Sequence, residues 1–342
     1  MRNSIALHAA LFVMIASTAE AAGNVAGEIN VYSSRHYNTD QVLYDAFTEA
    51  TGIGVNLIEA KGDALIERMV AEGESSPADV FITADGSRLA RAVEAGLFQP
   101  ADSEVLSAAV PANLRHPDGL WYGLSTRVRG IIYAKDRVAE DDIRHYEDLA
   151  DPQWAGKICI RSSSNVYNQS LAASMIATVG LEAAEIWATG LVANLARNPQ
   201  GGDTDQIKAV AAGECDLAVA NHYYFARLMT SDKPEDQDIA QGLNIIFPNQ
   251  DDRGAHINVS GAGIAAHAPN QEAAVKFLEY LVTPAAQAGF ASGNYEYPVI
   301  DDVKLTPILE GWGDYKTDAV SIISYGEYNA EALKMMDRVG WR

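Results

Sequence analysis

Short apolar runs alternate with amphipathic stretches from residue 28 onward. The run EINVYS starts at Glu28 and the run ADVFIT starts at Ala78, and both have the length and composition of buried strands. Between them, Leu65, Ile66 and Met69 recur at the spacing of one helix face. The pattern predicts strands over 28–33, 54–60 and 78–83. It predicts helices over 38–51, with Asn38 and Gln41 as a capping box, over 63–72, and from the end of the third strand to about residue 95.

The remainder of the chain continues this alternation. We expect strands at 129–134, 156–161, 216–221, 243–247 and 256–259, and helices at 170–195 with a break near Gly180, at 205–212, from 270 to about 290 and from about 324 to 338. Such units indicate an α/β fold whose sheets are mostly parallel and flanked by helices. Because the middle section interrupts the strands on either side of it, we expect two lobes with a ligand cleft between them. The predicted N-terminal lobe comprises 22–126 and 251–300, and the predicted C-terminal lobe comprises 127–250 and 301–342.

The chain is 342 residues long, which exceeds the usual size of one hydrophobic core and agrees with two domains. Its composition, 48% hydrophobic and 21% charged, is that of an ordinary globular protein. The net charge of −21 repels nucleic acid and anionic lipid, which argues against a nucleic-acid partner, and it attracts cations. Solubility in a salty medium explains the same acidity, so the charge alone does not indicate a metal.

The first twenty or so residues have a different pattern. Arg2 is followed by a mostly apolar run over 5–15 and then by Ala19-Glu20-Ala21, a small-x-small cleavage signal. We predict a signal peptide over 1–21, cleaved near Ala21, and therefore export; an ordinary N-terminal helix is the alternative. No later segment has the roughly 18 consecutive apolar residues that a membrane-spanning helix requires.

Tyrosine is concentrated directly after the predicted strands. Tyr37 follows the first strand, Tyr167 follows a strand of the middle section, and Tyr223 and Tyr224 follow the next one. In open α/β sheets, ligands bind beyond the carboxyl ends of the strands, so these side chains are expected to line one cleft. Taken singly, each tyrosine is more often a half-buried core or surface residue whose hydroxyl bonds a neighbour, and His36 is more often a hydrogen-bonded loop residue than a metal ligand. Their shared position after the strands is what favours a binding site.

Four phenols in one cleft favour a hard, highly charged cation. Phenols have a reference pKa of about 10, so they ionise near neutral pH only beside a strong positive charge. Phenolate oxygen suits Fe(III), whereas zinc sites favour histidine and cysteine, and calcium sites favour carboxylates and carbonyls. Four phenolates around a trivalent ion leave about one excess negative charge, which a nearby arginine would balance.

Three motifs carry a resemblance to a known family. They are VYSSRHY at 31–37, SNVYN at 164–168 and NHYY at 221–224, in this order. Together they resemble the periplasmic ferric-iron-binding proteins, the bacterial transferrin-like family, over nearly the whole chain, and above all the members that hold iron with a tyrosine-rich shell and no obligatory anion. The resemblance implies a type II periplasmic-binding-protein fold, with Fe(III) as the transported ligand and no organic cofactor. It also implies an ABC transporter permease as partner, a periplasmic location and a monomeric state.

The same resemblance implies a set of iron ligands. His36 and Tyr37 would come from the first lobe, and Tyr167, Tyr223 and Tyr224 from the second. Each follows a predicted strand, in agreement with the cleft expected from the sheet.

One position departs from the better-known members of the family, which carry a glutamate ligand where this chain has Ala84. The missing carboxylate favours Tyr37 as the substitute ligand and argues against a phosphate-type synergistic anion. The neighbouring Asp85 is expected to point elsewhere. Arg127 matches the region where some relatives bind carbonate, and Arg227 lies one helical turn after Tyr223. Either arginine would balance the phenolates or hold an anion; a solvated surface position is the alternative for both.

Two other function classes compete with iron binding. A binding protein of the same fold could capture a polyamine, thiamine or an oxyanion, but such sites need carboxylates with stacked aromatics, or helix N-termini with arginine. An enzyme, for example a lyase with tyrosine and histidine as acid and base, is the second alternative. The chain contains no G-x-S-x-G, H-E-x-x-H, phosphate-loop or dinucleotide motif, so we do not expect an enzyme.

The two cysteines, Cys159 and Cys215, permit one disulfide in an exported protein. Each precedes a candidate ligand, Tyr167 or Tyr223, by eight residues. If both strands run in parallel toward one cleft, equal offsets place the cysteines side by side, at the roughly 4.8 Å spacing of neighbouring strands. We therefore predict a Cys159–Cys215 disulfide; two buried free thiols are the alternative.

Overall fold

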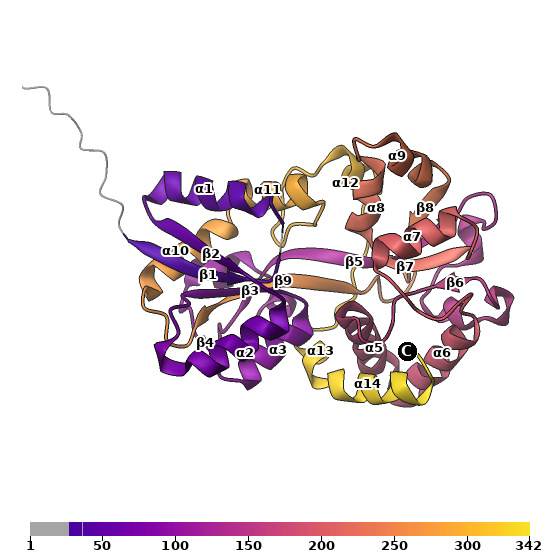
Figure 1. Ribbon diagram of the computed structural model, residues 1–342, viewed down its shortest axis with the longest axis horizontal. Helices are drawn as coiled ribbons and strands as arrows, with labels where there is room; N and C mark the ends of the chain where they lie inside the picture. Colours follow the sequence, from indigo (N-terminus) through magenta and orange to yellow (C-terminus); the bar gives the residue numbers. More distant parts are fainter. Residues whose placement is uncertain (1–26, 36) are drawn as a thin grey trace, which may run out of the picture.

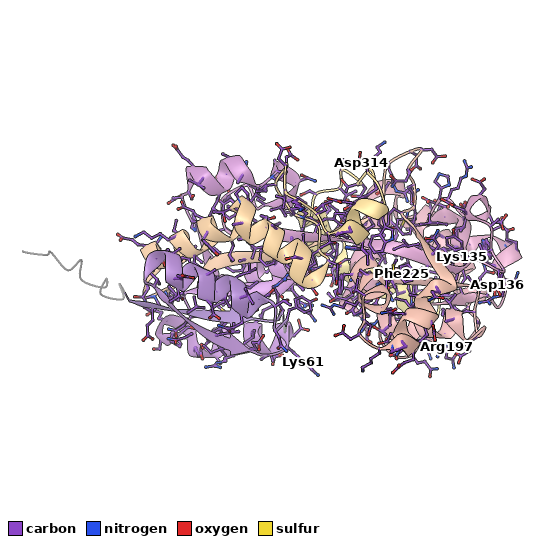
Figure 2. All side chains as sticks on the ribbon, turned by 90° about the horizontal axis from the view of Figure 1, so that it is seen from above. Lys61, Lys135, Asp136, Arg197, Phe225 and Asp314 are labelled. Atoms are coloured by element: carbon purple, nitrogen blue, oxygen red, sulfur yellow. A yellow bond between two sulfur atoms is a disulfide. The ribbon has the colours of Figure 1, made fainter. Side chains whose placement is uncertain are left out.

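The computed structural model describes residues 27–35 and 37–342 of the chain. The predicted signal peptide over 1–21 and the candidate ligand His36 lie outside the described residues. Figure 1 shows two halves side by side along the long axis of the molecule. Seen from above, Lys61 lies on one half and Lys135 on the other (Figure 2).

The halves are joined by two long strands and a short helix. Strand β5 (Tyr122–Ala134) and strand β9 (Ile257–Ala265) run antiparallel across the middle of the molecule (Figure 1). Helix α13 (Ile323–Glu327) packs against α3 (Gly86–Glu94) of one half and α5 (Val166–Val179) of the other. All thirteen residues of β5 and all nine of β9 are buried, including the polar and charged side chains that interrupt their apolar residues, namely Ser125, Thr126, Arg127 and Arg129 of β5 and Asn258 and Ser260 of β9.

The strands pair in the order β2-β1-β3-β9-β5-β7-β6, with β4 added on β9 and β8 on β5. The remaining strands are β1 (Glu28–Ser33), β2 (Gly54–Glu59), β3 (Val80–Ala84), β4 (Phe98–Gln99), β6 (Ile158–Cys159), β7 (Leu217–Asn221) and β8 (Leu243–Ile246). The α/β fold is as predicted, but the expectation of mostly parallel sheets is wrong. Only the β1–β2, β1–β3 and β6–β7 pairs among these strands are parallel, because β5 and β9 pair antiparallel with each of their neighbours.

Helices cover both faces of the sheet in each half (Figure 1). The first half carries α1 (Asp40–Thr51), α2 (Gly62–Glu72), α3, α4 (Glu104–Ala109), α10 (Gln271–Leu281) and α11 (Pro284–Asn294). The second half carries α5, α6 (Leu181–Ala193), α7 (Asp203–Ala211), α8 (His222–Met229), α9 (Pro234–Gln241), α12 (Pro307–Gly311) and α14 (Asn329–Arg338). Short 3-10 helices cover Gly73–Ser75, Ala112–Leu114, Glu140–Asp142, Glu147–Ala150 and Pro152–Trp154.

Two main hydrophobic cores correspond to the two halves. The larger draws on residues between Ile29 and Val128 and between Ala255 and Tyr325, and the other on residues between Ile131 and Val219 together with Ala332–Trp341. A third, smaller cluster lies beside β7 and α7. The lobe boundaries expected from the sequence stay a prediction. The two cores show which side chains pack together, but they do not define the residues at which the chain passes from one lobe to the other. Among the described residues, no helix combines the length and apolar character needed to cross a bilayer.

Three local expectations need correction. The single helix expected from 270 to 290 is two helices, because Pro284 cannot continue α10 and instead begins α11, with Thr283 as its N-cap. The last helix is likewise divided into α13 and α14. The predicted capping box at Asn38 and Gln41 does not form, because Thr39 is the N-cap of α1 and no side chain caps it.

Candidate metal centre

The four candidate tyrosines converge between the halves. Tyr37 follows β1, Tyr167 is the second residue of α5, and Tyr223 and Tyr224 lie in the first turn of α8. The ring centroids of Tyr37 and Tyr223 are 6.5 Å apart, and those of Tyr223 and Tyr224 are 4.3 Å apart. Tyr167 lies close enough that its charge would raise the pKa of the other three. The end of β1 and the first turns of α5 and α8 therefore meet at one place, as the strand-end rule predicts.

Burial disfavours ionisation of Tyr37, Tyr223 and Tyr224 in the absence of a cation. Tyr223 is fully buried, and its hydroxyl has no hydrogen-bond partner among the described residues. Burial, followed by repulsion from neighbouring phenolates such as that of Tyr167, raises the pKa of Tyr223 and Tyr224. Burial and the nearby Glu296 carboxylate do the same to the pKa of Tyr37. A buried hydroxyl without a partner is unfavourable by itself, so this position suits a ligand that accepts the oxygen.

An ion-pair network lies behind Tyr37. The Glu296 carboxylate is fully buried between Arg127 Nη2 at 2.8 Å and Arg35 Nη1 at 2.9 Å. Arg35 also pairs with Asp40 through Nε at 2.6 Å and Nη2 at 3.1 Å, and its Cζ lies 4.9 Å from the Tyr37 ring centroid. Burial opposes ionisation of Glu296, but the two arginines outweigh it and lower its pKa to about 2. The carboxylate is therefore ionised and fixes both guanidinium groups.

A second network lies behind Tyr167. Arg129 and Arg161 both pair with the buried Asp203, Arg161 at 2.7 Å, and Arg129 donates to Asn168 Oδ1 at 2.7 Å. Their Cζ atoms lie 5.9 Å and 5.8 Å from the Tyr167 ring centroid. A guanidinium at this distance interacts favourably with the face of an aromatic ring.

The two arginines expected from the sequence are both at the cluster. Arg127 is fully buried in the first network, so the alternative of a solvated surface position does not hold for it. The Cζ atom of Arg227 lies 5.0 Å from the Tyr37 ring centroid, 5.1 Å from that of Tyr223 and 5.9 Å from that of Tyr224. Its guanidinium also donates to Asn294 Oδ1. Arg227 is thus half-buried against three of the four rings rather than free in solvent.

Sequence reasoning missed several charged neighbours of the tyrosines. These are Arg35, Asp40, Arg129, Arg161, Asp203 and Glu296. Alternation along β5 would have placed Arg129 on the same face as Arg127, since the two are separated by one residue. Glu296 had no such signal, because it pairs with a residue 169 positions away. With Arg127 and Arg227 included, five arginines and three carboxylates surround the phenols, which leaves a net charge of +2.

His222 anchors the start of α8. The side chain is fully buried; its Nδ1 accepts from the Val128 amide at 3.1 Å, and its Nε2 donates to the Tyr295 carbonyl at 2.7 Å. Burial lowers its pKa to about 4, so it is neutral at physiological pH. Both ring nitrogens are engaged by the backbone, and His222 therefore positions Tyr223 rather than adding a ligand.

The residues after β3 also behave as expected from the missing glutamate. Ala84 ends the strand, and the next carboxylate, Asp85, accepts hydrogen bonds from Ser170 and Asn258. Asp85 is fully buried in these contacts. Its acceptor atoms are engaged in this network and not free for a cation.

The predicted Cys159–Cys215 disulfide is confirmed, with a Cα–Cα distance of 5.9 Å. The register argument behind it was wrong. Parallel pairing of β6 with β7 sets Cys159 opposite Ala218, so Cys215 lies before β7 and reaches Cys159 from the preceding turn. The bond closes a span of 56 residues, for which the loop-entropy relation gives roughly 4 kcal/mol of stabilisation. It ties together the bases of the segments that carry Tyr167 and Tyr223.

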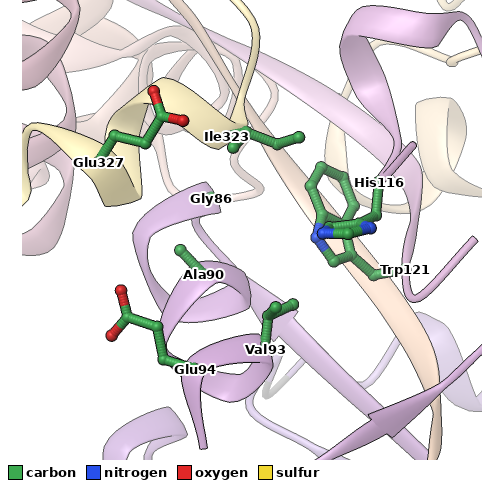
Figure 3. Close-up of a pocket in the computed structure, with 8 residues that line it drawn as sticks. All are labelled: Gly86, Ala90, Val93, Glu94, His116, Trp121, Ile323 and Glu327. Carbon is green, nitrogen blue, oxygen red and sulfur yellow. The ribbon is translucent and has the colours of Figure 1, made fainter. Parts of the chain in front are cut away.

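The tyrosine cluster differs from the apolar cavity of about 150 Å³ between α3 and α13. Figure 3 shows that cavity lined by Ala90, Val93, Ile323 and Trp121, with the carboxylates of Glu94 and Glu327 nearby. None of its lining residues is a tyrosine. An oxygen-rich, arginine-backed cluster and an apolar hollow suit different ligands, and only the first suits a hard cation.

Comparisons with known proteins agree with this chemistry. Residues 75–312 match the family described as bacterial extracellular solute-binding protein. Iron uptake protein A1 of Synechocystis is 52% identical over 315 residues, which cover 92% of this chain and 88% of the relative. The major ferric iron-binding protein of Neisseria meningitidis is 30% identical and aligns over 97% of this chain and 98% of its own length.

A solved structure gives the same result. The Trichodesmium protein described as IdiA or FutA, in complex with iron and citrate ligands, is 56% identical. It superposes with a TM-score of 0.90 over 92% of this chain and all of its own. This chain therefore belongs to the bacterial extracellular solute-binding proteins, in the group that includes the ferric iron-binding proteins.

Proposed function

We propose that this protein captures Fe(III) between its two halves and delivers it to an ABC-type importer. The observation that carries the proposal is the fully buried hydroxyl of Tyr223, which lies within a cluster of tyrosines and has no hydrogen-bond partner among the described residues. Its relatives include proteins named for iron uptake and ferric-iron binding. Iron is cargo in this proposal, which assigns the protein no enzymatic role.

The proposed ligands are the phenolates of Tyr37, Tyr167, Tyr223 and Tyr224, with His36 as a fifth donor. Each phenol releases its proton when the ion enters, because a trivalent cation stabilises phenolate far more than burial opposes it. Four phenolates and Fe(III) carry about one net negative charge, which the surrounding excess of arginine offsets.

The arginines divide between two tasks. Arg127 is held by Glu296 and has no solvent contact, so it acts as a fixed positive charge. Arg227 lies against the rings and is half-exposed, so it is the group we assign to balancing charge at the mouth of the site. Since Ala84 supplies no carboxylate, no phosphate-type anion is part of this proposal.

Export, docking and lobe organisation complete the proposal. The signal peptide over 1–21 directs the chain to the periplasm, where it serves a membrane permease as a monomer. The N-terminal lobe (22–126 and 251–300) supplies His36 and Tyr37, and the C-terminal lobe (127–250 and 301–342) supplies the other tyrosines. Closure of the lobes about β5 and β9 would bury the ion.

An absorbance titration tests the function. The metal-free protein is colourless, and we expect a broad visible band that saturates at one Fe(III) per chain, because phenolate-to-iron charge transfer absorbs there. A protein that binds one iron without colour would contradict phenolate ligation. A protein that binds no iron would contradict the function itself.

A further inference from the structure

A strained, fully buried aspartate lies where the two cores meet. Asp85 joins the end of β3 to the start of α3 with φ of 105°, in a region that side chains other than glycine rarely occupy. Its carboxylate accepts a hydrogen bond from the Ser170 hydroxyl, whose Oγ lies 2.9 Å from both carboxylate oxygens. It also accepts from Asn258 Nδ2 at 2.7 Å and from the Ser87 amide at 2.8 Å. A backbone conformation of this kind persists only where the surroundings hold it.

These contacts cross between the halves. Val80, Phe81 and Leu89, on either side of Asp85, belong to the first core, whereas Leu171, the residue after Ser170, belongs to the second. The Ser87 bond alone would cap α3. The bonds from Ser170 and Asn258 go beyond capping and tie β3 to α5 and to the crossing strand β9.

The same region is tightly packed. Helix α13 lies against both α3 and α5, and a Cβ atom at Gly86 or Gly326 would collide with Ile322 or Ala90. Figure 3 shows Gly86 and Ala90 on α3 facing the α13 residue Ile323. The Asp85–Ser170 contact therefore joins two bodies that have little freedom to move apart locally.

We propose that Asp85 is a positioning residue for iron binding, which holds the first turn of α5, and with it Tyr167, against the half that carries Tyr37. Ser170 lies one helical turn after Tyr167, so a bond fixed at Ser170 fixes the turn that presents the phenol. The carboxylate thus acts through α5 and does not touch the ion. This inference rests on the proposed function where its test measures the release of iron.

Two variants and two matched controls test it. Asp85→Asn keeps the shape and the φ tolerance of the residue but removes the charge, and Ser170→Ala removes the donor on α5. Asp79→Asn is the control for the first: Asp79 is also fully buried and lies at the opposite end of β3, but it bonds Asn30 and Asn270. Ser174→Ala is the control for the second, one turn further along α5 and bonded to Asp318.

The first measurement is the rate at which EDTA removes Fe(III), followed by the visible band. We expect Asp85→Asn and Ser170→Ala each to release iron about tenfold to a hundredfold faster and to shift the band, as loss of an orienting group does at metal sites. The double variant should release iron no faster than the faster single one, because both remove one contact. The controls should release iron at the parent rate.

The second measurement is hydrogen exchange in the metal-free protein. The amides of Asn168 and Gln169, which close the first turn of α5 on Asn165, should exchange faster in Asp85→Asn and Ser170→Ala than in the parent protein and the controls. Parent release rates and parent exchange in both variants would overturn the inference, as would equal effects in Asp79→Asn. If the parent protein binds no iron, the proposed function fails and the exchange data alone decide the role of Asp85. If Asp85→Asn does not fold, Ser170→Ala, which retains the helix, carries the test.

Discussion

Two groups of buried tyrosine occupy different regions of this molecule. Beside the crossing strands, Tyr146 donates its hydroxyl to the Arg129 carbonyl of β5 at 2.5 Å, and Tyr325 donates to the Ile257 carbonyl of β9 at 2.7 Å. Both are fully buried, as is Tyr223 in the cluster between the halves. The Tyr223 hydroxyl, however, has no partner among the described residues. Burial alone therefore does not separate a structural tyrosine from a ligand.

The partners of the ring and the hydroxyl make the distinction. Tyr297 shows that a hydroxyl without a partner is insufficient to identify a ligand. Its oxygen also has no hydrogen bond within the described part of the chain, but its ring packs on Tyr315 and His222 in an aromatic cluster. Tyr223 differs in its neighbours: the Cζ atom of Arg227 lies 5.1 Å from its ring centroid, and the phenol rings of Tyr37 and Tyr224 lie beside it. A free hydroxyl, a nearby arginine and neighbouring phenols together mark the tyrosines that suit a trivalent cation.

The largest expected effect is loss of iron binding on removal of one cluster hydroxyl. Tyr223→Phe and Tyr224→Phe should each weaken Fe(III) binding by about a hundredfold or more, since even orienting groups at metal sites contribute 10- to 100-fold. The ring packing stays, and Tyr223→Phe removes a buried hydroxyl that no described residue bonds, so the free energy of unfolding of this variant should be unchanged or higher. Chelator competition and thermal unfolding measure the two quantities.

Tyr297→Phe is the matched control for this experiment. It removes an equally unpartnered hydroxyl outside the cluster, and iron affinity should stay at the parent value. If the Tyr223 and Tyr224 variants bound iron with the affinity of the parent protein, their assignment as ligands would be contradicted.

The reverse outcome is expected beside the crossing strands. Tyr146→Phe and Tyr325→Phe each leave a buried backbone carbonyl without its donor, which should lower the free energy of unfolding by about 1 to 3 kcal/mol. The Fe(III) band and affinity should remain those of the parent protein. Urea unfolding and iron titration of the same preparations test both statements. A variant that lost iron but not stability would remove the distinction between the two groups.

Sequence alone located the clustered tyrosines because their position depends on a local rule. Each follows a strand that an apolar run reveals, and strand ends in an α/β sheet meet at one edge. The charge behind the rings could not be found in this way. Glu296 pairs with Arg35 and Arg127, which are distant in sequence, and only the folded chain brings them together. The prediction of mostly parallel sheets was wrong for a similar reason, because the antiparallel pairing of β5 with β9 depends on how two segments that are distant in sequence cross.

The smallest expected effect concerns an acidic group beside α5. Asp318 is buried near Ser174, and burial, despite opposing hydrogen bonds, raises its pKa to about 6. The unfolded chain has a carboxyl pKa of about 3.9, so between about pH 4 and pH 6 the folded protein binds more protons than the unfolded one. Stability from this group is therefore present at low pH and is lost as pH rises through about 6. Asp318→Asn, which is never charged, should be more stable than the parent by about 1 to 2 kcal/mol at pH 7.5.

The difference should shrink as pH falls and vanish only at about pH 3, because the parent carboxyl is protonated in both states only below the unfolded-state pKa of about 3.9. Urea unfolding at pH 7.5, 6 and 4.5 measures this trend. Iron binding at pH 7.5 should not change, since Asp318 belongs to the region beside the crossing strands and bonds Ser174 rather than any cluster tyrosine. A constant difference at all three pH values would show that Asp318 is ionised in the folded protein throughout. In that case the raised pKa would be wrong, and burial beside α5 would be offset by neighbouring positive charge such as Arg253.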